Sequence, residues 1–577
     1  MYPPSPQRWV ARATPLLAAC LLSVPLASCG GGGGDDGSGG GAPTGGPAAL
    51  VVSSVSPSSG PLQGGLLVTV AGSGFAASGT EVFFGGVPAT EVLVLDDSTL
   101  TCRVPAGSDA VQVGVVVRNA AGSGSLDLAF EYAQLAGPDF NGDGLTDVAV
   151  GATRYGPSDA GAVYVFFGGS GSLSDVQGGE AGLRILGPSS GSRFGERMAA
   201  GDLDGDGVTD LAVSAPRQGT GGAVFVFLGP LVPGATVSAS AASAILTAEV
   251  LSSGDFFGDS LAIGDLTGDG RDDLVVGAVH HDFPIFDTGA VYIFNGDADF
   301  THRSASDADV KLTGSASANQ FGNDLTIADV SGDGRADLLV GSPFGGGVRG
   351  ELSVFFGGDS LVSGTSNQAQ IQIVGETLSD LFGAAIAASD VNGDGVADMV
   401  VGAPGHDALG SGAGAAYVFF GGTSGAAAAA DADAILLGSV AGDGFGLGLS
   451  AGDINGDGLA EVVVGARGAD VGATNNGRVY TFFGGPFFGD GVANGANMIF
   501  TGLAVTNEQF GQVVELIDVD GDEQLDVCVG SFELGRGDVH VFLGATSMSD
   551  LLASQDAVTF TGEVGGDSFG VAVASTR

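Results

Sequence analysis

The stretch DLDGDGVTD at residues 202–210, followed at once by the apolar run LAVSA at 211–215, decides the fold of this chain. Six further nonapeptides share its pattern of alternating oxygen-bearing side chains: DFNGDGLTD, DLTGDGRDD, DVSGDGRAD, DVNGDGVAD, DINGDGLAE and DVDGDEQLD. In chain order the seven first residues are 63, 63, 64, 61, 63 and 65 positions apart. A fixed period of this length indicates one supersecondary unit that is built seven times.

The nonapeptides have the composition of calcium-binding loops. Side-chain oxygens at positions 1, 3, 5 and 9, together with the main-chain carbonyl of position 7, can surround one hard cation. Glycine at position 6 permits the sharp turn that brings these ligands together. By this rule the predicted ligands are Asp139, Asn141, Asp143, Leu145, Asp147, Asp202, Asp204, Asp206, Val208, Asp210, Asp265, Thr267, Asp269, Arg271, Asp273, Asp329, Ser331, Asp333, Arg335, Asp337, Asp390, Asn392, Asp394, Val396, Asp398, Asp453, Asn455, Asp457, Leu459, Glu461, Asp518, Asp520, Asp522, Gln524 and Asp526.

The seven loops are not equal. Thr267 and Ser331 occupy position 3, where the other loops have Asp or Asn, and we expect weaker binding there. Glu523 replaces the glycine of position 6 in the last loop, so its geometry should depart most from the others. The sequence therefore predicts up to seven Ca²⁺ sites and leaves the occupancy of the third, fourth and seventh loops open.

An EF-hand is excluded by the residues that follow each loop. An EF-hand needs a bidentate glutamate at position 12 and a helix on each side. Position 12 is valine in all seven copies, namely Val150, Val213, Val276, Val340, Val401, Val464 and Val529. These valines belong to short apolar runs that end at Gly or Ser, which is the pattern of strands. The loops are therefore expected inside β-hairpins.

The remainder of each unit also repeats. Phe-Gly stands eight residues before six of the loops, at Phe194, Phe257, Phe321, Phe382, Phe445 and Phe510. After each loop come a second apolar run such as GAVYVFFGG and a further one such as LRILG. Each unit thus reads as four short strands that are apolar on both faces. Radially repeated four-stranded sheets predict an all-β fold, a seven-bladed β-propeller over residues 137–577.

This arrangement resembles the FG-GAP repeats of integrin α-subunit propellers and their bacterial relatives. The closest matches to the Gly-Ala-Pro element are VGAP at Val401 and VSAP at Val213. The resemblance covers residues 137–577 and implies calcium in the hairpin loops of one propeller face. It also implies that partners, where they exist, dock on the opposite face.

The two ends of the repeat region predict how the ring closes. The loop at Asp139 has no Phe-Gly before it, whereas Phe569-Gly570 has no loop after it. The C-terminal SFGVAVAS is therefore expected to supply the missing first strand of the blade that continues from Asp147. Closure by both termini would leave no free sheet edge in that blade.

The first 49 residues are expected to export and anchor the protein. Arg8 and Arg12 precede the apolar PLLAACLLSVPLA, and the tetrapeptide LASC at 26–29 resembles a bacterial lipobox. It implies a lipoprotein signal peptide at 1–28, lipidation of Cys29 and a Gly-rich tether at 29–49. LAAC at 17–20 fits less well, and an ordinary secretory signal is the alternative. Since no later stretch is long and apolar enough to span a bilayer, attachment is expected through the lipid alone.

Residues 50–133 differ from the repeats. The segments VSSVSPSSGPLQGG, VTVAGSGF and VFFGGVPAT resemble an IPT/TIG domain, a small immunoglobulin-like β-sandwich. Such a domain here is either a spacer between tether and propeller or an independent ligand-binding module. The two cysteines beyond Cys29, Cys102 and Cys528, fall in different domains and are expected as buried thiols and not as a disulfide.

The charge balance excludes some partners. The chain has 18 basic and 66 acidic residues and a net charge of −48. Such a surface repels nucleic acid and anionic lipid. Without metal the packed carboxylates of the loops repel one another, so folding is expected to depend on calcium.

Three short motifs invite functional interpretations that we set aside. Arg536-Gly537-Asp538 spells an integrin-binding tripeptide but aligns with the ordinary start of a strand. His280-His281-Asp282 looks like a metal cluster, yet adjacent residues of a strand point to opposite faces. Gly187–Gly191 matches a nucleophile elbow without the strand-turn-helix context that motif requires. With no catalytic constellation in view, an enzyme is not expected.

The sequence therefore predicts a calcium-stabilised, lipid-anchored and monomeric protein of the cell envelope, at the outer membrane or cell surface. Its propeller is expected to act in adhesion or to bind a protein or glycan ligand. A structural envelope scaffold without a specific ligand is the alternative, and a secreted hydrolase or lyase on the propeller's open face is a third reading.

Overall fold

The computed structural model describes residues 50–575, except for 57–58, 62–66, 77, 106–111, 121, 134–136, 169–174, 250–253, 283–286, 359–360, 423–424, 523, 532–535 and 546–548. The predictions for the signal peptide, Cys29 and the tether lie outside the described residues. Strands dominate the described chain, and none of its helices is long and apolar enough to cross a membrane.

The region before the repeats is a two-sheet sandwich, as predicted. Its core includes Phe84 and Phe130, whose rings meet edge to face at 5.1 Å, and the buried free thiol of Cys102. The first sheet has the order β1 (Val51–Ser56), β3 (Leu67–Ser73), β7 (Thr99–Arg103), β6 (Thr90–Val94). The second has the order β2 (Ser59–Pro61), β9 (Gly122–Ala133), β8 (Gln112–Asn119), β4 (Glu81–Phe84), β5 (Val87–Pro88).

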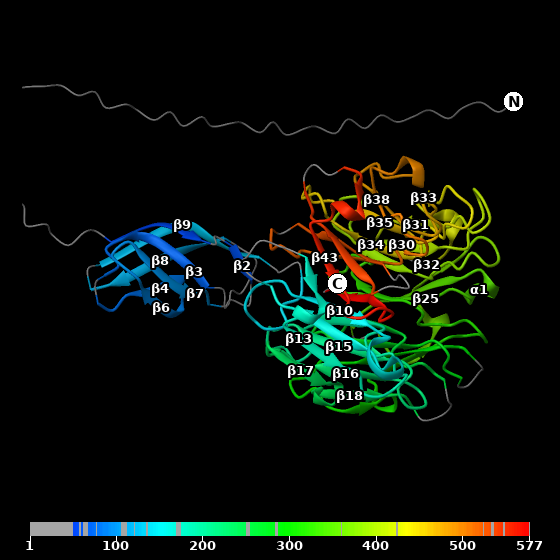
Figure 1. Ribbon diagram of the computed structural model, residues 1–577, viewed down its shortest axis with the longest axis horizontal. Helices are drawn as coiled ribbons and strands as arrows, with labels where there is room; N and C mark the ends of the chain where they lie inside the picture. The colour runs from blue at the N-terminus through cyan, green and yellow to red at the C-terminus, as the bar shows by residue number, and fades with distance from the viewer. Residues whose placement is uncertain are drawn as a thin grey trace, which may run out of the picture. The chain divides into compact units, whose positions relative to one another are not determined.

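Seven further sheets form a closed β-propeller (Figure 1), which confirms the predicted fold. From the inner strand outward, blade 1 consists of β44 (Phe569–Ala574), β10 (Val148–Ala152), β11 (Ala162–Phe166), β13 (Leu183–Leu186) and β17 (Ala235–Ser238). Blade 2 consists of β14 (Met198–Gly201), β15 (Asp210–Ala215), β16 (Ala223–Phe227), β18 (Ala244–Thr247) and β22 (Arg303–Ser304). Blade 3 consists of β19 (Ser260–Gly264), β20 (Asp273–Ala278), β21 (Ala290–Phe294), β23 (Val310–Thr313) and β27 (Gly364–Thr365), and blade 4 of β24 (Leu325–Ala328), β25 (Asp337–Ser342), β26 (Glu351–Phe355), β28 (Ile371–Val374) and β32 (Gly425–Ala428).

Blades 5 to 7 follow the same plan. They consist of β29 (Ile386–Ser389), β30 (Asp398–Ala403), β31 (Ala415–Phe419), β33 (Ala434–Leu437), β37 (Gly491–Val492); β34 (Gly448–Gly452), β35 (Glu461–Ala466), β36 (Arg478–Phe482), β38 (Met498–Thr501), β42 (Leu551–Leu552); and β39 (Val513–Ile517), β40 (Asp526–Ser531), β41 (Asp538–Phe542), β43 (Val558–Thr561), β12 (Val176–Gln177). Helical segments are single turns: α1 (Gly345–Val348), a π-turn at Tyr155–Asp159, and 3₁₀ turns at Gly178–Glu180, Ala239–Ala241, Ala305–Asp307, Ser366–Gln368, Ala429–Asp431, Ala493–Gly495 and Ala553–Gln555.

Each blade has five strands where the sequence pattern predicts four. The fifth strand comes from the next blade and lies parallel to the fourth, as where Leu183 of β13 faces Ala235 of β17. It is formed by the segment that leads into the next blade's own fourth strand. The added strand covers the outer edge of the sheet, which would otherwise present unpaired backbone groups.

The ring closes at two edges of the first and last blades. At the inner edge β44 pairs antiparallel with β10, placing Val573 opposite Val150, as predicted from the C-terminal Phe-Gly. At the outer edge β12, which belongs to the first repeat, pairs parallel with β43 of the last, placing Val176 opposite Phe560. Closure therefore depends on both ends of the repeat region.

Phenylalanines of the Phe-Gly dipeptides wedge between neighbouring blades. The Phe194 ring lies 5.5 Å from Phe225, and the Phe194 N–H donates to the Ala160 carbonyl at 3.2 Å. Gly161 lies opposite Phe194 with φ 84°, and a Cβ on Gly161 would lie 2.2 Å from the Phe194 carbonyl oxygen. Only glycine allows that approach.

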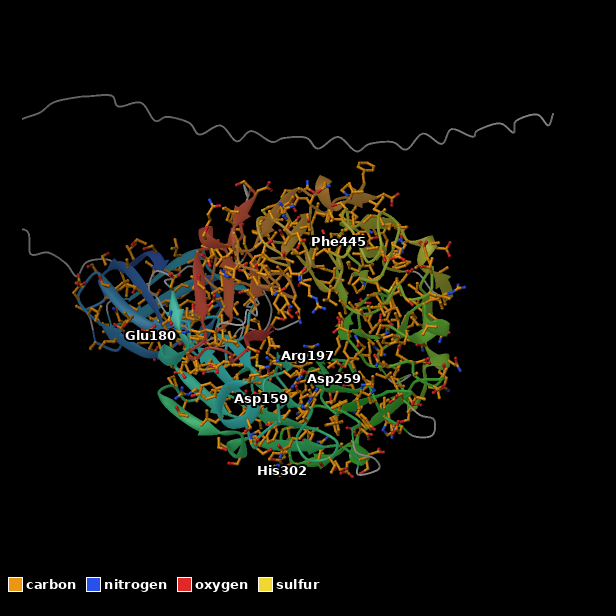
Figure 2. All side chains as sticks on the ribbon, turned by 45° about the vertical axis from the view of Figure 1, so that its right-hand side comes forward. Asp159, Glu180, Arg197, Asp259, His302 and Phe445 are labelled. Carbon is orange, nitrogen blue, oxygen red and sulfur yellow. The ribbon has the colours of Figure 1, made fainter. Side chains whose placement is uncertain are left out.

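The two ends of the propeller carry different elements. The Phe-Gly dipeptides lie at the end where the second and third strands of each blade are joined, and the acidic nonapeptides at the end where the first and second are joined. We call these ends the Phe-Gly face and the acidic-loop face. The seven inner strands, including β14, β19 and β44, surround a central channel (Figure 2).

Candidate metal centres in the acidic loops

All seven acidic loops lie at the same place in their blades. Six begin directly after or close to the end of an inner strand, and their ninth residue starts or precedes the second strand, as Asp210 starts β15. The loop at Asp139 leads into β10, whose inner neighbour is the C-terminal β44. This repetition places seven equivalent loops on the acidic-loop face.

Position 1 organises each loop through its carboxylate. In the second loop Asp202 Oδ1 accepts the N–H groups of Gly205 at 2.8 Å and Asp206 at 3.1 Å, and Oδ2 accepts that of Gly207 at 2.9 Å. The same bonds to positions 4 and 5 recur at Asp139, Asp265, Asp329, Asp390, Asp453 and Asp518. The loop backbone is thus folded around a carboxylate before any cation is considered.

Position 9 ties the loop to the third strand. Asp210 is fully buried; its Oδ2 accepts the Leu203 N–H at 2.9 Å, and its Oδ1 accepts the Gly229 N–H at 2.8 Å. Asp147, Asp273, Asp337, Asp398 and Asp526 make the corresponding pair of bonds. In the sixth loop Glu461 Oε2 accepts the Ile454 N–H at 3.0 Å. Position 9 is therefore a structural carboxylate whether or not it also ligates metal.

In the two loops that have Asp at positions 1, 3 and 5, the three carboxylates converge. The carboxylate atoms of Asp202, Asp204 and Asp206 lie within 4.8 Å of one another, as do those of Asp518, Asp520 and Asp522. The position 9 carboxylates are in neither cluster, since they face the backbone N–H groups described above. Although Glu523 itself is outside the described residues, the seventh loop folds around Asp518 as the others do.

The other loops bring position 3 against neighbouring ligands. Asn141 Nδ2 donates to Asp143 at 3.1 Å, and Asn392 Nδ2 donates to Asp394 at 3.0 Å. Asn455 Nδ2 donates to Glu461 at 2.9 Å. The hydroxyl groups of Thr267 and Ser331 each donate to position 1 at 3.4 Å. The predicted side-chain ligands are thus neighbours in every loop.

Burial makes the ninth carboxylate hard to ionise without a counter-charge. Loss of water raises the pKa of Asp147, Asp210, Asp526 and Glu461 to about 7, and that of Asp273 and Asp398 to about 6. Neighbouring acids add to this effect and backbone N–H bonds oppose it. The side-chain donors are all oxygen, with no thiolate or imidazole, which suits a hard cation such as Ca²⁺.

The loops also join neighbouring blades. The position 2 carbonyl of one loop accepts an N–H from the segment after the third strand of the next blade, as Leu203 accepts from Asp297 at 3.0 Å and Val391 from Gly485 at 2.7 Å. The same bond forms at Phe140, Leu266, Val330 and Ile454. A loop held rigid by a cation would therefore stabilise two blades at once.

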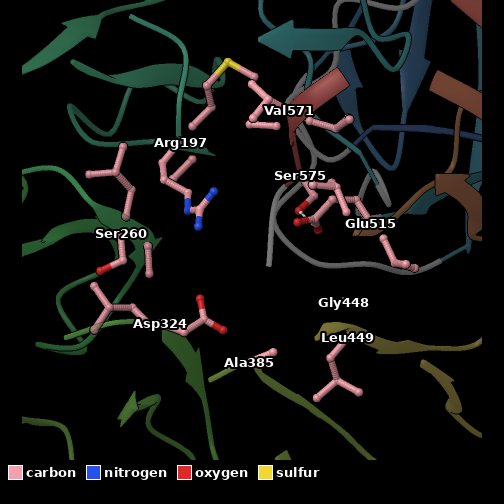
Figure 3. A pocket seen from close by; sticks show the side chains of 18 of the residues that line it. Arg197, Ser260, Asp324, Ala385, Gly448, Leu449, Glu515, Val571 and Ser575 are labelled. Atoms are coloured by element: carbon pink, nitrogen blue, oxygen red, sulfur yellow. Dashed lines mark hydrogen bonds between the residues drawn. The ribbon is translucent and has the colours of Figure 1, made fainter. Parts of the chain in front are cut away.

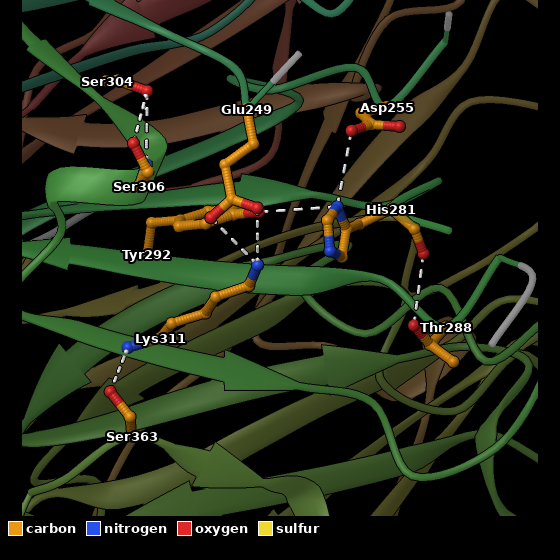
Figure 4. A network of polar contacts seen from close by, with 9 residues as sticks. All are labelled: Glu249, Asp255, His281, Thr288, Tyr292, Ser304, Ser306, Lys311 and Ser363. Atoms are coloured by element: carbon orange, nitrogen blue, oxygen red, sulfur yellow. Dashed lines mark hydrogen bonds and ion pairs between the residues drawn. The ribbon is translucent and has the colours of Figure 1, made fainter. Parts of the chain in front are cut away.

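The three short motifs have structural roles. Arg536-Gly537-Asp538 leads into β41, and Gly187–Gly191 is a turn after β13. His280 and His281 contact different acids. His280 Nδ1 lies 3.2 Å from Asp287. His281 Nδ1 lies 3.4 Å from Asp255, a contact drawn in Figure 4. Burial lowers the pKa of His281 despite that acid. The two rings do not form a common metal site.

Sequence reasoning missed one feature of the channel. Arg197, which precedes β14, and Arg467, which follows β35, line the same depression at the Phe-Gly face. They are far apart in the chain and occupy different positions of the repeat. No short sequence motif could have predicted that the two arginines lie near the same depression. The one available signal is that basic residues are scarce in this chain.

The protein-family comparison agrees with this architecture. The IPT/TIG domain model matches residues 50–132, and the FG-GAP repeat model matches 132–166, 194–227, 257–294, 321–355, 382–419 and 445–482. The seventh blade, whose loop has Glu523 for glycine, lies outside these matches but has the same strands as the others.

Curated relatives share parts of the repeat region. Integrin alpha-PS2 of Drosophila melanogaster is 32% identical over 229 residues, which cover 37% of this chain and 16% of the integrin. Integrin alpha-5 of Xenopus laevis is 31% identical, over 37% of this chain and 20% of the integrin. Phosphatidylinositol-glycan-specific phospholipase D of Rattus norvegicus is 28% identical, over 49% of this chain and 36% of that enzyme. This chain thus spans a minor part of each relative's length. From its matched repeats, its sandwich and its seven blades, the chain is an FG-GAP repeat β-propeller protein with an IPT/TIG domain.

Proposed function

We propose that this protein is a calcium-stabilised, lipid-anchored and monomeric cell-surface module whose Phe-Gly face binds a protein or glycan ligand. Integrin alpha-like FG-GAP repeats are typical of ligand-binding or adhesion modules. The observation that carries the proposal is the division of the propeller's two faces. On the acidic-loop face the carboxylates fold their own loops and the position 2 carbonyls hold the next blade, which leaves the other face for recognition.

Calcium has a definite structural role in this proposal. Positions 1, 3 and 5 would hold the ion, with position 9 and the position 7 carbonyl completing the set. The ion supplies the positive charge that the packed carboxylates of each loop lack. Through the position 2 carbonyls, a filled loop would stiffen the junction with the next blade at the six loops where this bond forms.

Calorimetry and thermal melting test the calcium part. Titration of chelated protein with Ca²⁺ should release heat with several sites per chain, and EGTA should lower the melting temperature by about 10 °C or more, since each site adds binding energy to the folded state. Asp206→Asn, in a loop with three converging carboxylates, should remove one site. Glu81→Gln, at an exposed position of β4 outside the propeller, is the matched charge control. An unchanged melt in EGTA and no binding heat would refute calcium stabilisation.

Ligand binding is tested separately. Purified propeller, with and without Ca²⁺, should capture a discrete protein or glycan from a surface-protein pull-down or a glycan array, and capture should need Ca²⁺ only to keep the fold. Failure of both screens with folded protein would favour the alternative, a structural envelope scaffold. The anchor is tested by labelled palmitate, which should enter the wild-type protein and not Cys29→Ser.

An enzymatic function is the weaker reading. The phospholipase D relatives carry an enzyme's name, but the rat sequence is matched over 36% of its length. In the described part of this chain the buried His281 and Tyr292 belong to a network of polar contacts that also includes Lys311 and Glu249 (Figure 4). Neither His281 nor Tyr292 lines the channel. No observation favours a particular reaction.

A further inference from the structure

The central channel widens at the Phe-Gly face into a basin of about 330 Å³. Its walls come from several blades: Arg197 from the second, Asn323 from the fourth, Arg467 from the sixth and Gln512 from the seventh. Arg197 and Arg467 are the charged residues among its described lining. Figure 2 shows Arg197 beside the central opening. We call this depression the arginine basin.

Among the described residues neither guanidinium forms a close ion pair with a carboxylate, although Arg197 interacts electrostatically with Asp259. Arg467 Nη1 donates to Gln512 Oε1 at 3.0 Å, and Arg197 Nη1 donates to the Glu196 carbonyl oxygen at 3.2 Å. The Glu196 carboxylate is paired with Arg193 at 3.2 Å. Both arginine side chains are exposed, so their remaining N–H groups are accessible to a ligand in the basin.

The basin also differs from the rest of the channel. Asp324 lines the channel together with Arg197 and has the position in the fourth blade that Arg197 has in the second. Farther in, the lining includes Glu515 and Ser575 (Figure 3), and near the acidic-loop face it includes Asp453. Glu515 is engaged by Ser575, whose hydroxyl group donates to it at 3.0 Å. Acidic side chains therefore line the channel from the level of Arg197 to the acidic-loop face, whereas the described lining of the arginine basin has two arginines as its charged residues, in a chain whose net charge is −48.

Around the arginines the lining offers amide groups and apolar surface. Gln320 and Asn323 contribute amides, and Phe344, Leu381 and Leu447 contribute apolar side chains, with Phe344 38% exposed. A concave lining that combines apolar side chains with a few placed polar groups is the usual form of a ligand site. Arginine is the residue best suited to hold a carboxylate through two parallel N–H bonds.

We propose that the arginine basin binds a carboxylate of an acidic peptide segment whose neighbouring apolar side chain packs on Phe344, Leu381 and Leu447. This inference rests on the proposed function and names the ligand class that the Phe-Gly face takes. A peptide is favoured over an acidic glycan because Phe344 is the single aromatic residue in the described lining, whereas the aliphatic surface matches a leucine-like side chain.

Fluorescence anisotropy with labelled peptides tests the proposal. The probes are (Glu-Leu)₃ and its uncharged counterpart (Gln-Leu)₃, on Ca²⁺-loaded full-length protein, with tetragalacturonate as an acidic glycan competitor. The variants are Arg197→Gln, Arg467→Gln and both together. The matched control is Arg118→Gln, which removes the same charge from an exposed position of the IPT/TIG domain. Thermal melts confirm that each variant is folded.

The proposal expects (Glu-Leu)₃ to bind, (Gln-Leu)₃ to bind at least about tenfold more weakly, and each basin variant to lose about tenfold, while Arg118→Gln is unchanged. Asp259→Asn should tighten binding by up to about fivefold, because Asp259 is an acid that interacts electrostatically with Arg197. If (Glu-Leu)₃ bound the basin variants as tightly as the wild-type protein, the proposal would be overturned. Arginine-dependent binding of tetragalacturonate without peptide binding would overturn it too.

The outcome separates this inference from the proposed function. If a partner captured in the pull-down still binds the double variant, the arginine basin is refuted while the ligand-binding function stands. If folded protein captures nothing and binds neither probe, both are refuted.

Discussion

Two blade junctions contain the same kind of polar cluster, a glutamate paired with a basic side chain that lies near a tyrosine ring. The junctions differ in how the chain connects the paired residues. At the junction of blades 2 and 3, Glu249 pairs with Lys311 at 2.9 Å, and Lys311 lies 5.0 Å from the Tyr292 ring (Figure 4). At the closing junction of blades 7 and 1, Glu563 pairs with Arg184 at 2.6 Å, and Arg184 lies 5.7 Å from the Tyr155 ring.

The difference is in the chain between the partners. The first pair is separated by 62 residues and the second by 379. Bringing distant segments together costs more chain entropy, so the closing junction is the harder one to form. Closure thus uses the ordinary inter-blade chemistry, with β44 and β12 as its added elements.

Removal of β44 should destabilise the closing junction more than any single substitution there. Truncation after residue 565 deletes the inner strand of blade 1, including the buried Phe569 and Val573. Each such side chain contributes about 1.5–3 kcal/mol through burial, and β10 becomes a bare edge. We expect the melting temperature to fall by more than about 15 °C or cooperative melting to disappear.

Calorimetry on the truncated chain measures this, with truncation after Ser575 as the control. A melt that is the same as that of the full chain would contradict closure by the C-terminal strand.

Glycine substitutions at the two junctions should come next. A Cβ on Gly537 would lie 2.3 Å from the Phe569 carbonyl oxygen, and one on Gly222 would lie 2.4 Å from that of Phe257. Both residues also have positive φ. Each Gly→Ala variant should lose about 2–5 kcal/mol of unfolding free energy.

The closing-junction variant should in addition unfold faster, because its blades are not joined directly by chain. Denaturant unfolding rates distinguish the two, and Gly565→Ala, where a Cβ meets nothing, is the control. If Gly222→Ala unfolded faster than Gly537→Ala, the closing junction would not be the weaker of the two.

These junctions show what sequence can and cannot predict. The loops, the strands and the closing strand follow from residues that recur at one period, so Phe569 could be placed without its loop. The fifth strands could not, because Arg303–Ser304 and Gly364–Thr365 have no strand pattern and pair only where tertiary structure presents an edge.

The candidate sites divide in the same way. The acidic loops are local, and their side chains lie together because they are two to eight residues apart. The arginine basin joins Arg197 to Arg467 through the ring alone, and the Glu563–Arg184 pair joins opposite ends of the repeat region. Such contacts are set by the topology and leave no mark in the local sequence.

Neutralising the ion pairs should have a smaller effect that is similar at both junctions. The four side chains are 15–27% exposed, so solvent screens each pair. Glu249→Gln and Glu563→Gln should each cost about 1 kcal/mol. Chemical denaturation measures the change, and the double variants with Lys311→Gln or Arg184→Gln isolate the pair from the loss of one charge. A closing pair that costs several kcal/mol more than its counterpart would show special chemistry at closure.

The smallest effect is expected at Asp538, the last residue of the Arg-Gly-Asp tripeptide. Asp538 starts β41 as Ala223 starts β16, so Asp538→Ala gives the closing junction the residue found at the junction of blades 2 and 3. The Arg536 carbonyl accepts the Phe569 N–H at 3.4 Å, and this backbone bond does not depend on the tripeptide's side chains. We expect a stability change within about 0.5 kcal/mol and unchanged attachment of integrin-bearing cells to coated protein. Loss of attachment with an unchanged melt would show instead that the tripeptide is an adhesion site and that the closing junction differs from the others in function.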